Sequence, residues 1–114
     1  MISEATYALA RTRYVCRPLD YVVVKGKNKP VLVYELIGAK ERVRDEAVKA
    51  VRVYIEGFEA MSQRKFKKAE KRFKSFLDLV LDDITATKHL RACKEYQKNP
   101  PPPDWDGVVK MTEK

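Results

Sequence analysis

The sequence predicts an α+β fold, in which a β-hairpin near the N-terminus is followed by about three antiparallel helices. Two observations support this prediction. β-Branched residues gather in two short runs on either side of a turn-forming segment. Further along the chain, the spacing of apolar residues changes from two positions to three or four. The length of 114 residues suits one domain at most.

Residues 1–38 are expected to form a strand end, a short helix and a hairpin. Ser3 can cap a helix that runs to about Arg11, because a serine hydroxyl accepts a hydrogen bond from a free amide of the first turn. The hairpin arms are residues 22–24 and 31–36. Between them, Lys-Gly-Lys-Asn-Lys-Pro holds the Gly, Asn and Pro that are typical of a chain reversal.

Residues 39–96 are expected to form a helical module. Ser62-Gln63 and Asp82-Asp83 mark the turns between its helices, and Thr85 is a candidate N-cap for the third helix. Each helix carries an apolar stripe that indicates a buried face. The stripes are Val43, Ala47, Ala50, Val51, Tyr54, Phe58 and Met61, then Phe66, Ala69, Phe73, Phe76, Leu77 and Val80, and finally Ala86, Leu90, Cys93 and Tyr96.

Residues 97–114 are predicted to be a proline-rich extended tail. Four consecutive prolines favour a stiff polyproline II segment. Trp105, the only tryptophan, follows them, and an exposed indole in a loose tail is unusual. We therefore expect Trp105 to lie in an apolar groove of the helical module, lined by residues such as Tyr54, Phe58, Phe73 or Tyr96.

The net charge of +8 is concentrated in residues 64–74, which hold seven basic residues and one acidic residue. Such a run can contact nucleic acid or anionic lipid. However, Phe66, Ala69 and Phe73 occur within it at helical spacing, which favours a solvated helix face. RNA binding is a weaker alternative, because the sequence lacks the aromatic strand signature of common RNA modules. We therefore favour no nucleic-acid partner.

Other features indicate a cytoplasmic protein. If this chain is part of a longer protein, that protein could still have a membrane anchor elsewhere. No apolar run approaches the ~20 residues of a membrane span, and the first residues do not have the pattern of a signal peptide. Cys16 and Cys93 are isolated from each other and are expected to be buried free thiols. His89, the sole histidine, has no catalytic partner at a suitable spacing, so we interpret it as a helix-face histidine.

The stretch from Arg17 to Leu36 resembles the end of the catalytic domain of class III adenylyl and guanylyl cyclases. In that family an arginine-rich strand leads to Val-Lys-Gly-Lys, a short turn, and Pro-Val-x-Val-Tyr-Glu-Leu, and this sequence has the same order. Met1 to Tyr7 also look like the family's strand-to-helix entry upstream. The resemblance implies that residues 1–38 are the C-terminal end of a cyclase catalytic domain, whose remainder is a partner of this chain.

The resemblance implies one site residue, Lys25, which would place a point charge beside the nucleotide polyphosphate. The family's metal-binding aspartates, its base-reading residues and its Asn/Arg pair come earlier and are not found here. Two Mg or Mn ions are therefore implied for the parent and none for this chain, which we expect to be inactive alone. Arg17 is expected to be a structural, strand-end arginine.

The first two helices resemble a tetratricopeptide repeat (TPR). Gly57 stands where that family has a small residue, Ala69 stands at the tight helix crossing, and Phe73 stands at an aromatic position, although Ala60 and Leu81 depart from the pattern. A lone repeat cannot cover both of its faces, and the third helix could supply a cap. Hairpin, helices and proline-rich tail also follow one another as in cyclases whose catalytic domain precedes TPR-like helices.

The favoured interpretation is a C-terminal part of a class III cyclase, whose parent converts ATP or GTP to the 3′,5′-cyclic nucleotide and pyrophosphate. The helical module would serve regulation or contact a protein partner. The alternative is a free-standing α+β adaptor that binds peptides through its helices and has no catalytic role. A hairpin taken from a larger sheet has open edges, so we also expect a homo-oligomer.

Overall fold

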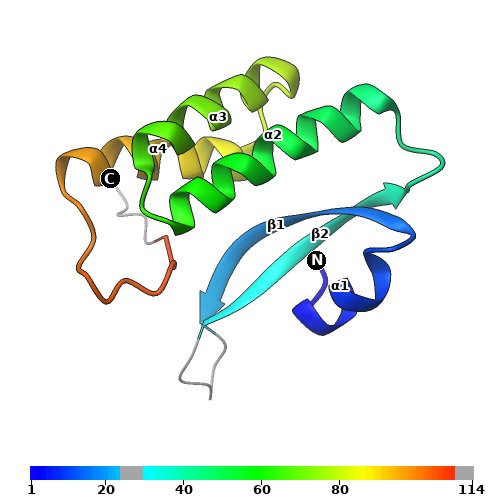
Figure 1. Ribbon diagram of the computed structural model, residues 1–114, viewed down its shortest axis with the longest axis horizontal. Helices are drawn as coiled ribbons and strands as arrows, with labels where there is room; N and C mark the ends of the chain where they lie inside the picture. The colour runs from blue at the N-terminus through cyan, green and yellow to red at the C-terminus, as the bar shows by residue number, and fades with distance from the viewer. Residues whose placement is uncertain (24–29, 110–114) are drawn as a thin grey trace.

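The structure, a computed structural model, describes residues 1–23 and 30–109 and has an α+β architecture, as predicted. Three long helices pack together at one end of the molecule, and the hairpin lies beneath them (Figure 1). The elements in chain order are α1 (Glu4–Ala10), β1 (Tyr14–Val23), β2 (Pro30–Ala39), α2 (Asp45–Ser62), α3 (Phe66–Leu79) and α4 (Ile84–Lys98).

The hairpin consists of β1 and β2, which pair antiparallel from Tyr14 opposite Ala39 to Val23 opposite Pro30. The register shifts between Pro18 and Asp20, where a β-bulge leaves Leu19 without a partner residue on β2. Proline has no backbone N–H to contribute to the ladder, which is why such a residue accompanies a bulge. The bulge frees the Leu19 carbonyl for contacts outside the sheet.

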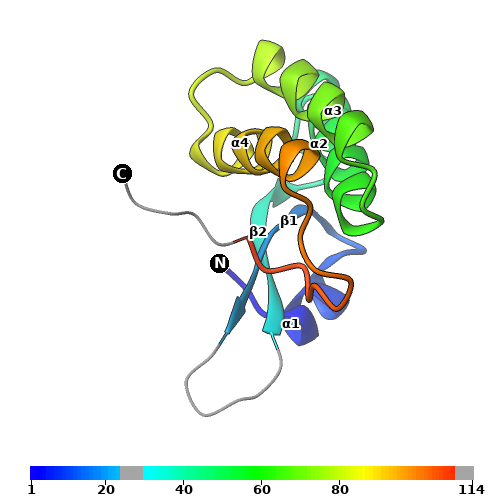
Figure 2. The same ribbon diagram turned by 90° about the vertical axis from the view of Figure 1, so that its left-hand side faces the viewer.

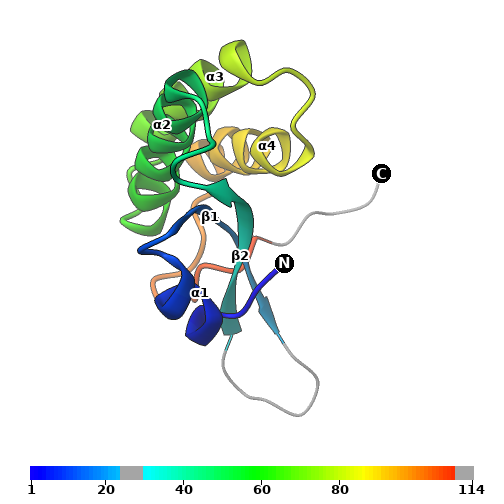
Figure 3. The same cartoon turned by 90° about the vertical axis from the view of Figure 1, so that its right-hand side faces the viewer.

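The segment before the hairpin is organised as predicted. Ile2 exchanges two backbone hydrogen bonds with Tyr34, at 2.8 and 2.9 Å, so the expected strand end is present as a short bridge. Ser3 then caps α1, because its hydroxyl accepts a hydrogen bond from the Thr6 amide at 3.2 Å. Tyr7 of α1 stacks on the Tyr34 ring with centroids 3.9 Å apart. α1 is thereby held on the hairpin, apart from the long helices (Figure 3).

α2 and α3 pack closely, and Gly57 allows their close approach. A Cβ atom at this position would lie 3.1 Å from the Arg72 Cβ and 3.2 Å from the Phe73 ring. Ala69 of α3 is fully buried, as expected of a small residue at a helix crossing. α4 then packs against α3 on the side that faces the hairpin (Figure 2). The core therefore lies between the helices and β1.

Three boundaries differ from the predictions. Asp83, not Thr85, caps α4, and its carboxylate accepts a hydrogen bond from the Ala86 amide at 2.9 Å. A carboxylate also interacts favourably with the helix dipole, which a threonine hydroxyl does not. In addition, α3 ends at Leu79, before the acidic pair, and α4 continues to Lys98 instead of ending at 96.

The tail is held by the turn between α2 and α3. Arg64 in that turn donates hydrogen bonds to the carbonyls of Pro101 and Pro102, at 2.7 and 3.0 Å. Pro101 and Val109 are buried, so the described part of the tail is packed at both ends. This packing agrees with the prediction that the tail folds back along the helical module.

Trp105 lies in an aromatic groove at the end of α4. Its ring meets Tyr96 and Phe66 with centroids 5.3 and 5.8 Å apart, and its indole N–H donates to the Val108 carbonyl at 2.9 Å. Tyr96 was a predicted wall of this groove, whereas Phe66 was not. Tyr54, Phe58 and Phe73 instead form the core with His89. The reason is that the tail meets the helices at the turn that precedes Phe66.

The tail's position predicts the effect of Gly107→Ala. Gly107 has φ +91°, and a Cβ there would lie 2.9 Å from the Tyr21 ring. The backbone conformation alone should cost about 1–2 kcal/mol for alanine, and the contact with Tyr21 adds to that cost. The variant should release the tail, which would shift the Trp105 emission to longer wavelength and increase its quenching by acrylamide.

Asp104→Ala, at an exposed position of the same tail, is the matched control and should leave the emission unchanged. Wild-type emission equal to that of free indole in water, with full quencher access, would show that the tail is not docked.

Candidate functional site

Lys25, the site residue that the cyclase resemblance implies, lies outside the described residues. It belongs to the segment that joins β1 to β2. The structure does describe how the two strands that carry this segment are held against the helices. Polar contacts from β1 to α4 and α2 do this, and we call them the clasp. The clasp consists of Arg17, Leu19 and Asp20 of β1, Tyr54 of α2, and Asp83, Lys88 and His89 at the start of α4.

Arg17 is the centre of the clasp and is only 6% exposed. Its guanidinium donates two hydrogen bonds to Asp83, at 2.9 and 3.1 Å, and one to Glu35 at 2.8 Å. It also lies over the Tyr54 ring, 4.8 Å from the centroid, and 5.7 Å from that of Phe76. Breaking such a buried pair by removing one partner typically costs about 3–5 kcal/mol.

The position of Arg17 corrects one prediction. It lies in the interior of β1, not at a strand end, and it joins the hairpin to the helices. Burial acts to raise the pKa of Asp83, but the hydrogen bonds from Arg17 and from the Ala86 amide outweigh burial and hold this pKa below its usual value. Sequence reasoning missed the partnership, because Arg17 and Asp83 are 66 residues apart.

His89 is the second buried polar group of the clasp. It is 1% exposed, so the face of α4 that it occupies is the buried one, and it belongs to the core. Its Nε2–H donates to the Leu19 carbonyl at 2.7 Å, and the Tyr54 hydroxyl donates to the same oxygen at 3.4 Å. Nδ1 is buried and has no hydrogen-bond partner within the described part of the chain. Burial lowers the pKa of His89.

A third contact completes the clasp. Lys88 forms an ion pair with Asp20, the β1 residue that follows the bulge. The contacts of Arg17, Leu19 and Asp20 together fix the middle of β1 against the first turns of α4. The clasp therefore fixes β1, the strand that precedes Lys25 in the sequence, to the helical module.

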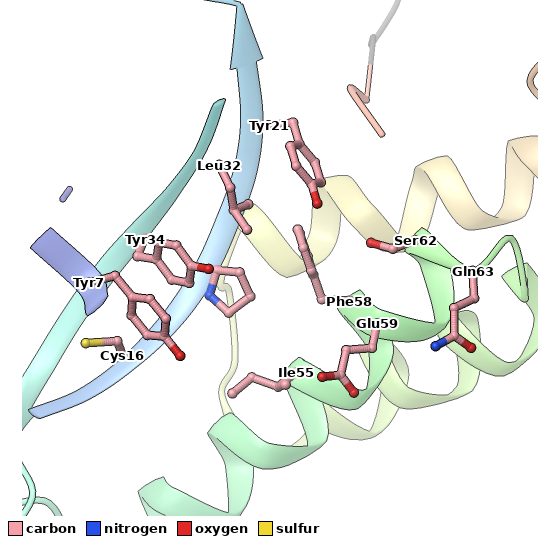
Figure 4. Close-up of a pocket in the computed structure, with 11 residues that line it drawn as sticks. Tyr7, Cys16, Tyr21, Leu32, Tyr34, Ile55, Phe58, Glu59, Ser62 and Gln63 are labelled. Atoms are coloured by element: carbon pink, nitrogen blue, oxygen red, sulfur yellow. The ribbon is translucent and has the colours of Figure 1, made fainter. Parts of the chain in front are cut away.

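A groove lies between the hairpin and α2, and we call it the hairpin–α2 groove (Figure 4). Its larger part has a volume of ≈ 460 Å³, and a second hollow of ≈ 250 Å³ shares Tyr7, Cys16 and Ile55 with it. The rings of Tyr21 and Phe58 form a stacked pair, with centroids 6.1 Å apart, that lines the larger part (Figure 4). Sequence reasoning did not find this groove, because its two walls come from separate elements.

Both cysteines are buried free thiols, as predicted. Burial raises the pKa of Cys93 to about 12, so that thiol stays protonated at neutral pH. Cys16 differs in lining the hairpin–α2 groove. Within residues 1–23 and 30–109, no three His, Cys, Asp or Glu side chains come together as a metal-binding group.

Within the basic run, residues 66–74 belong to α3 and its lysines form a solvated helix face, as favoured from the sequence, whereas Arg64 lies in the preceding turn and binds the tail. Phe66, Ala69 and Phe73 point into the core, whereas Lys67 and Lys71 of α3 are exposed. None of the helices in the described residues has both the length and the apolar character needed to cross a membrane.

Comparisons of the chain with protein-family models, with curated proteins and with solved structures give no match.

The environment of His89 predicts a loss of stability in mild acid. The unfolded chain binds a proton on histidine at about pH 6.5, whereas the folded protein holds His89 neutral to a lower pH. The contribution of neutral His89 to stability is therefore fully present above the unfolded pKa of about 6.5, and it decreases as the pH falls from there toward the folded pKa. Between about pH 7 and about pH 5.5 the free energy of unfolding, measured by urea titration, should fall by up to about 1.2 kcal/mol.

His89→Gln removes the titrating group and keeps an N–H that can reach Leu19. The decrease between those two pH values should be absent in this variant, whatever its overall stability. An equal decrease in the variant and the wild type would assign the effect to other groups.

Proposed function

We propose that this chain is the C-terminal part of a class III nucleotide cyclase, in which the helices support the last hairpin of the catalytic domain. The observation that carries the proposal is the hairpin itself. Val-Lys-Gly-Lys stands between two strands that pair with each other, preceded by a strand bridge and a short helix in the expected order. The parent would convert ATP or GTP to the 3′,5′-cyclic nucleotide and pyrophosphate.

In this proposal Lys25 neutralises the charge that develops on the phosphates. Lysine is a compact point charge that suits a polyphosphate whose orientation is fixed by other groups. The described residues offer no cluster for the two divalent ions. In this proposal, the upstream part of the catalytic domain binds those ions and recognises the base. That upstream part is therefore a partner of this chain.

The helices have a positioning role in this proposal, because the clasp ties them to the strand that precedes Lys25 in the sequence. A partner that displaces α4 would break or shift the hydrogen bonds from Arg17 to Asp83 and from His89 to Leu19, and would thereby move β1. The inner face of the helices is already covered by the chain's own residues, since Tyr21 of β1 and Trp105 and Val109 of the tail pack on the core. A regulatory partner would therefore contact outer surfaces.

A free-standing interaction protein is the second candidate function. Leu79, Leu81 and Ile84, around the turn between α3 and α4, are 60%, 78% and 84% exposed, which favours contact with a protein partner. Peptide binding on the inner face of α2 and α4 is less favoured, because the hairpin and the tail cover it. The reading frame upstream of Met1 separates the two candidates, since an in-frame stop codon there would favour the adaptor.

We also propose a cytoplasmic location and a homo-oligomer. The described sheet has only β1 and β2, and Ile2 bridges the outer side of β2 at Tyr34. The outer edge of β1 is therefore unpaired within the described residues, and Val23 at its end is 61% exposed. Such an edge can pair with a second copy. A strictly monomeric mass by light scattering, from micromolar to millimolar concentration, would contradict this proposal.

Lys25→Ala in the parent enzyme tests the proposed role. Turnover should fall by about 10²–10³-fold, the typical effect of losing one preorganised charge or donor at a transition state. Lys29→Ala, which removes the same charge from the same segment, is the matched control and should have little effect. The measurement is formation of cyclic nucleotide from ATP or GTP.

Equal and mild effects at both lysines would show that Lys25 does not have this role. The isolated 114-residue chain should form no cyclic nucleotide with Mg²⁺ or Mn²⁺, and activity of the pure chain would overturn the assignment of the metal ligands to the upstream part.

A further inference from the structure

We propose that the hairpin–α2 groove is a binding site for an anionic amphiphile, a molecule with an apolar body and a single carboxylate or phosphate head. The proposal does not rest on the cyclase function, because it concerns binding to this chain alone. Three features of the groove carry it: its size and partly apolar walls, the cations at one end, and the acidic residue at the other.

The groove has the size of a small-molecule site, and its walls combine apolar and aromatic side chains with polar ones. Its two parts, ≈ 460 and ≈ 250 Å³, are neighbours, and Tyr7, Cys16 and Ile55 line both. Sites for small ligands typically have volumes of about 300–1,000 Å³ and mostly apolar and aromatic walls. One wall is the hairpin with α1 and the other is α2, so elements of regular structure define the shape. Tyr21 and Phe58 extend the apolar wall in the larger part.

The smaller hollow provides an anion-binding end. Arg11, Lys40 and Arg52 all line it, and no acidic residue does. None of the three forms a salt bridge with any residue that the structure describes. Lys40 lies close enough to Cys16, which lines both parts of the groove, for its charge to oppose the effect of burial on the pKa of that thiol. Three unpaired cations around an apolar hollow favour one anionic group bound there.

The opposite end of the groove fixes the orientation of the ligand. Glu59, with Ser62 and Gln63, lines the end of the larger part on α2 (Figure 4). A carboxylate there repels an anionic head, so the head lies between Arg52 and Lys40 and the apolar body lies along Ile55 and Phe58. This polarity favours an amphiphile with one charged end over a polyanion, which would need cations along its whole length.

Calorimetric titration of this chain with dodecanoate and with dodecyl phosphate, each below its critical micelle concentration, tests the proposal. Both should bind, and the difference between them identifies the preferred head group. Dodecanol, which has the same apolar body without charge, should bind about tenfold more weakly or worse, because hydrogen bonds to charged groups are lost. Inorganic phosphate alone should show no measurable binding.

The double variant Lys40→Gln/Arg52→Gln locates the site. It should weaken dodecanoate binding by about tenfold or more. Lys49→Gln/Lys67→Gln removes the same total charge from exposed positions that do not line the groove, and it should bind like the wild type. All four side chains are exposed, so the variants are expected to fold, and circular dichroism checks this.

Protection of Cys16 from alkylation gives a second readout, which uses the wild-type protein. Dodecanoate should slow its reaction with iodoacetamide, because Cys16 lines both parts of the groove. Cys93, which is fully buried away from the groove, is the internal control and should be unaffected.

Several results would overturn the proposal. They are undetectable binding of both amphiphiles, equal affinity for dodecanol and dodecanoate, and equal weakening by the two double variants. Ligand-free alkylation of Cys16 that slows as protein concentration rises, in step with dimer formation by light scattering, would instead assign the groove to a second copy of the chain.

Discussion

The arrangement of hairpin and helices depends on burying the positive charge of Arg17. A guanidinium in a protein interior is destabilising by several kcal/mol unless carboxylates and hydrogen bonds compensate it. Here Asp83 and Glu35 provide that compensation, and the rings of Tyr54 and Phe76 cover the guanidinium. Because Asp83 also caps α4, one carboxylate determines both where that helix begins and where it contacts β1.

The bulge in β1 allows the remaining polar groups of the core to be buried. Without a partner on β2, Leu19 can accept hydrogen bonds from His89 and from Tyr54. These side chains are thereby held within an aromatic core that includes Phe73, whose ring lies 5.4 Å from that of His89. A regular strand would use the Leu19 carbonyl in the ladder and leave His89 without its acceptor, at a cost of about 1–3 kcal/mol.

These contacts have consequences for the proposed function. The helices do not present their inner face to solvent, because β1 and the tail occupy it. The helical module is therefore better suited to holding the two strands of the hairpin than to binding an extended peptide on that face. The hairpin–α2 groove lies beside the same hairpin, so a ligand bound there would contact β1 through Cys16 and Tyr21.

The sequence alone determined the local features: the hairpin, the Ser3 cap, the apolar stripes of the helices and the burial of both thiols. Each depends on residues a few positions apart, which periodicity and capping rules describe well. The tertiary structure decided that Asp83 rather than Thr85 caps α4, that His89 lies in the core, and that Phe66 completes the Trp105 groove. Arg17 meets Asp83 across 66 residues of sequence and His89 meets Leu19 across 70. Such pairs depend on how whole elements pack against one another, and the spacing of residues within each element does not encode that packing.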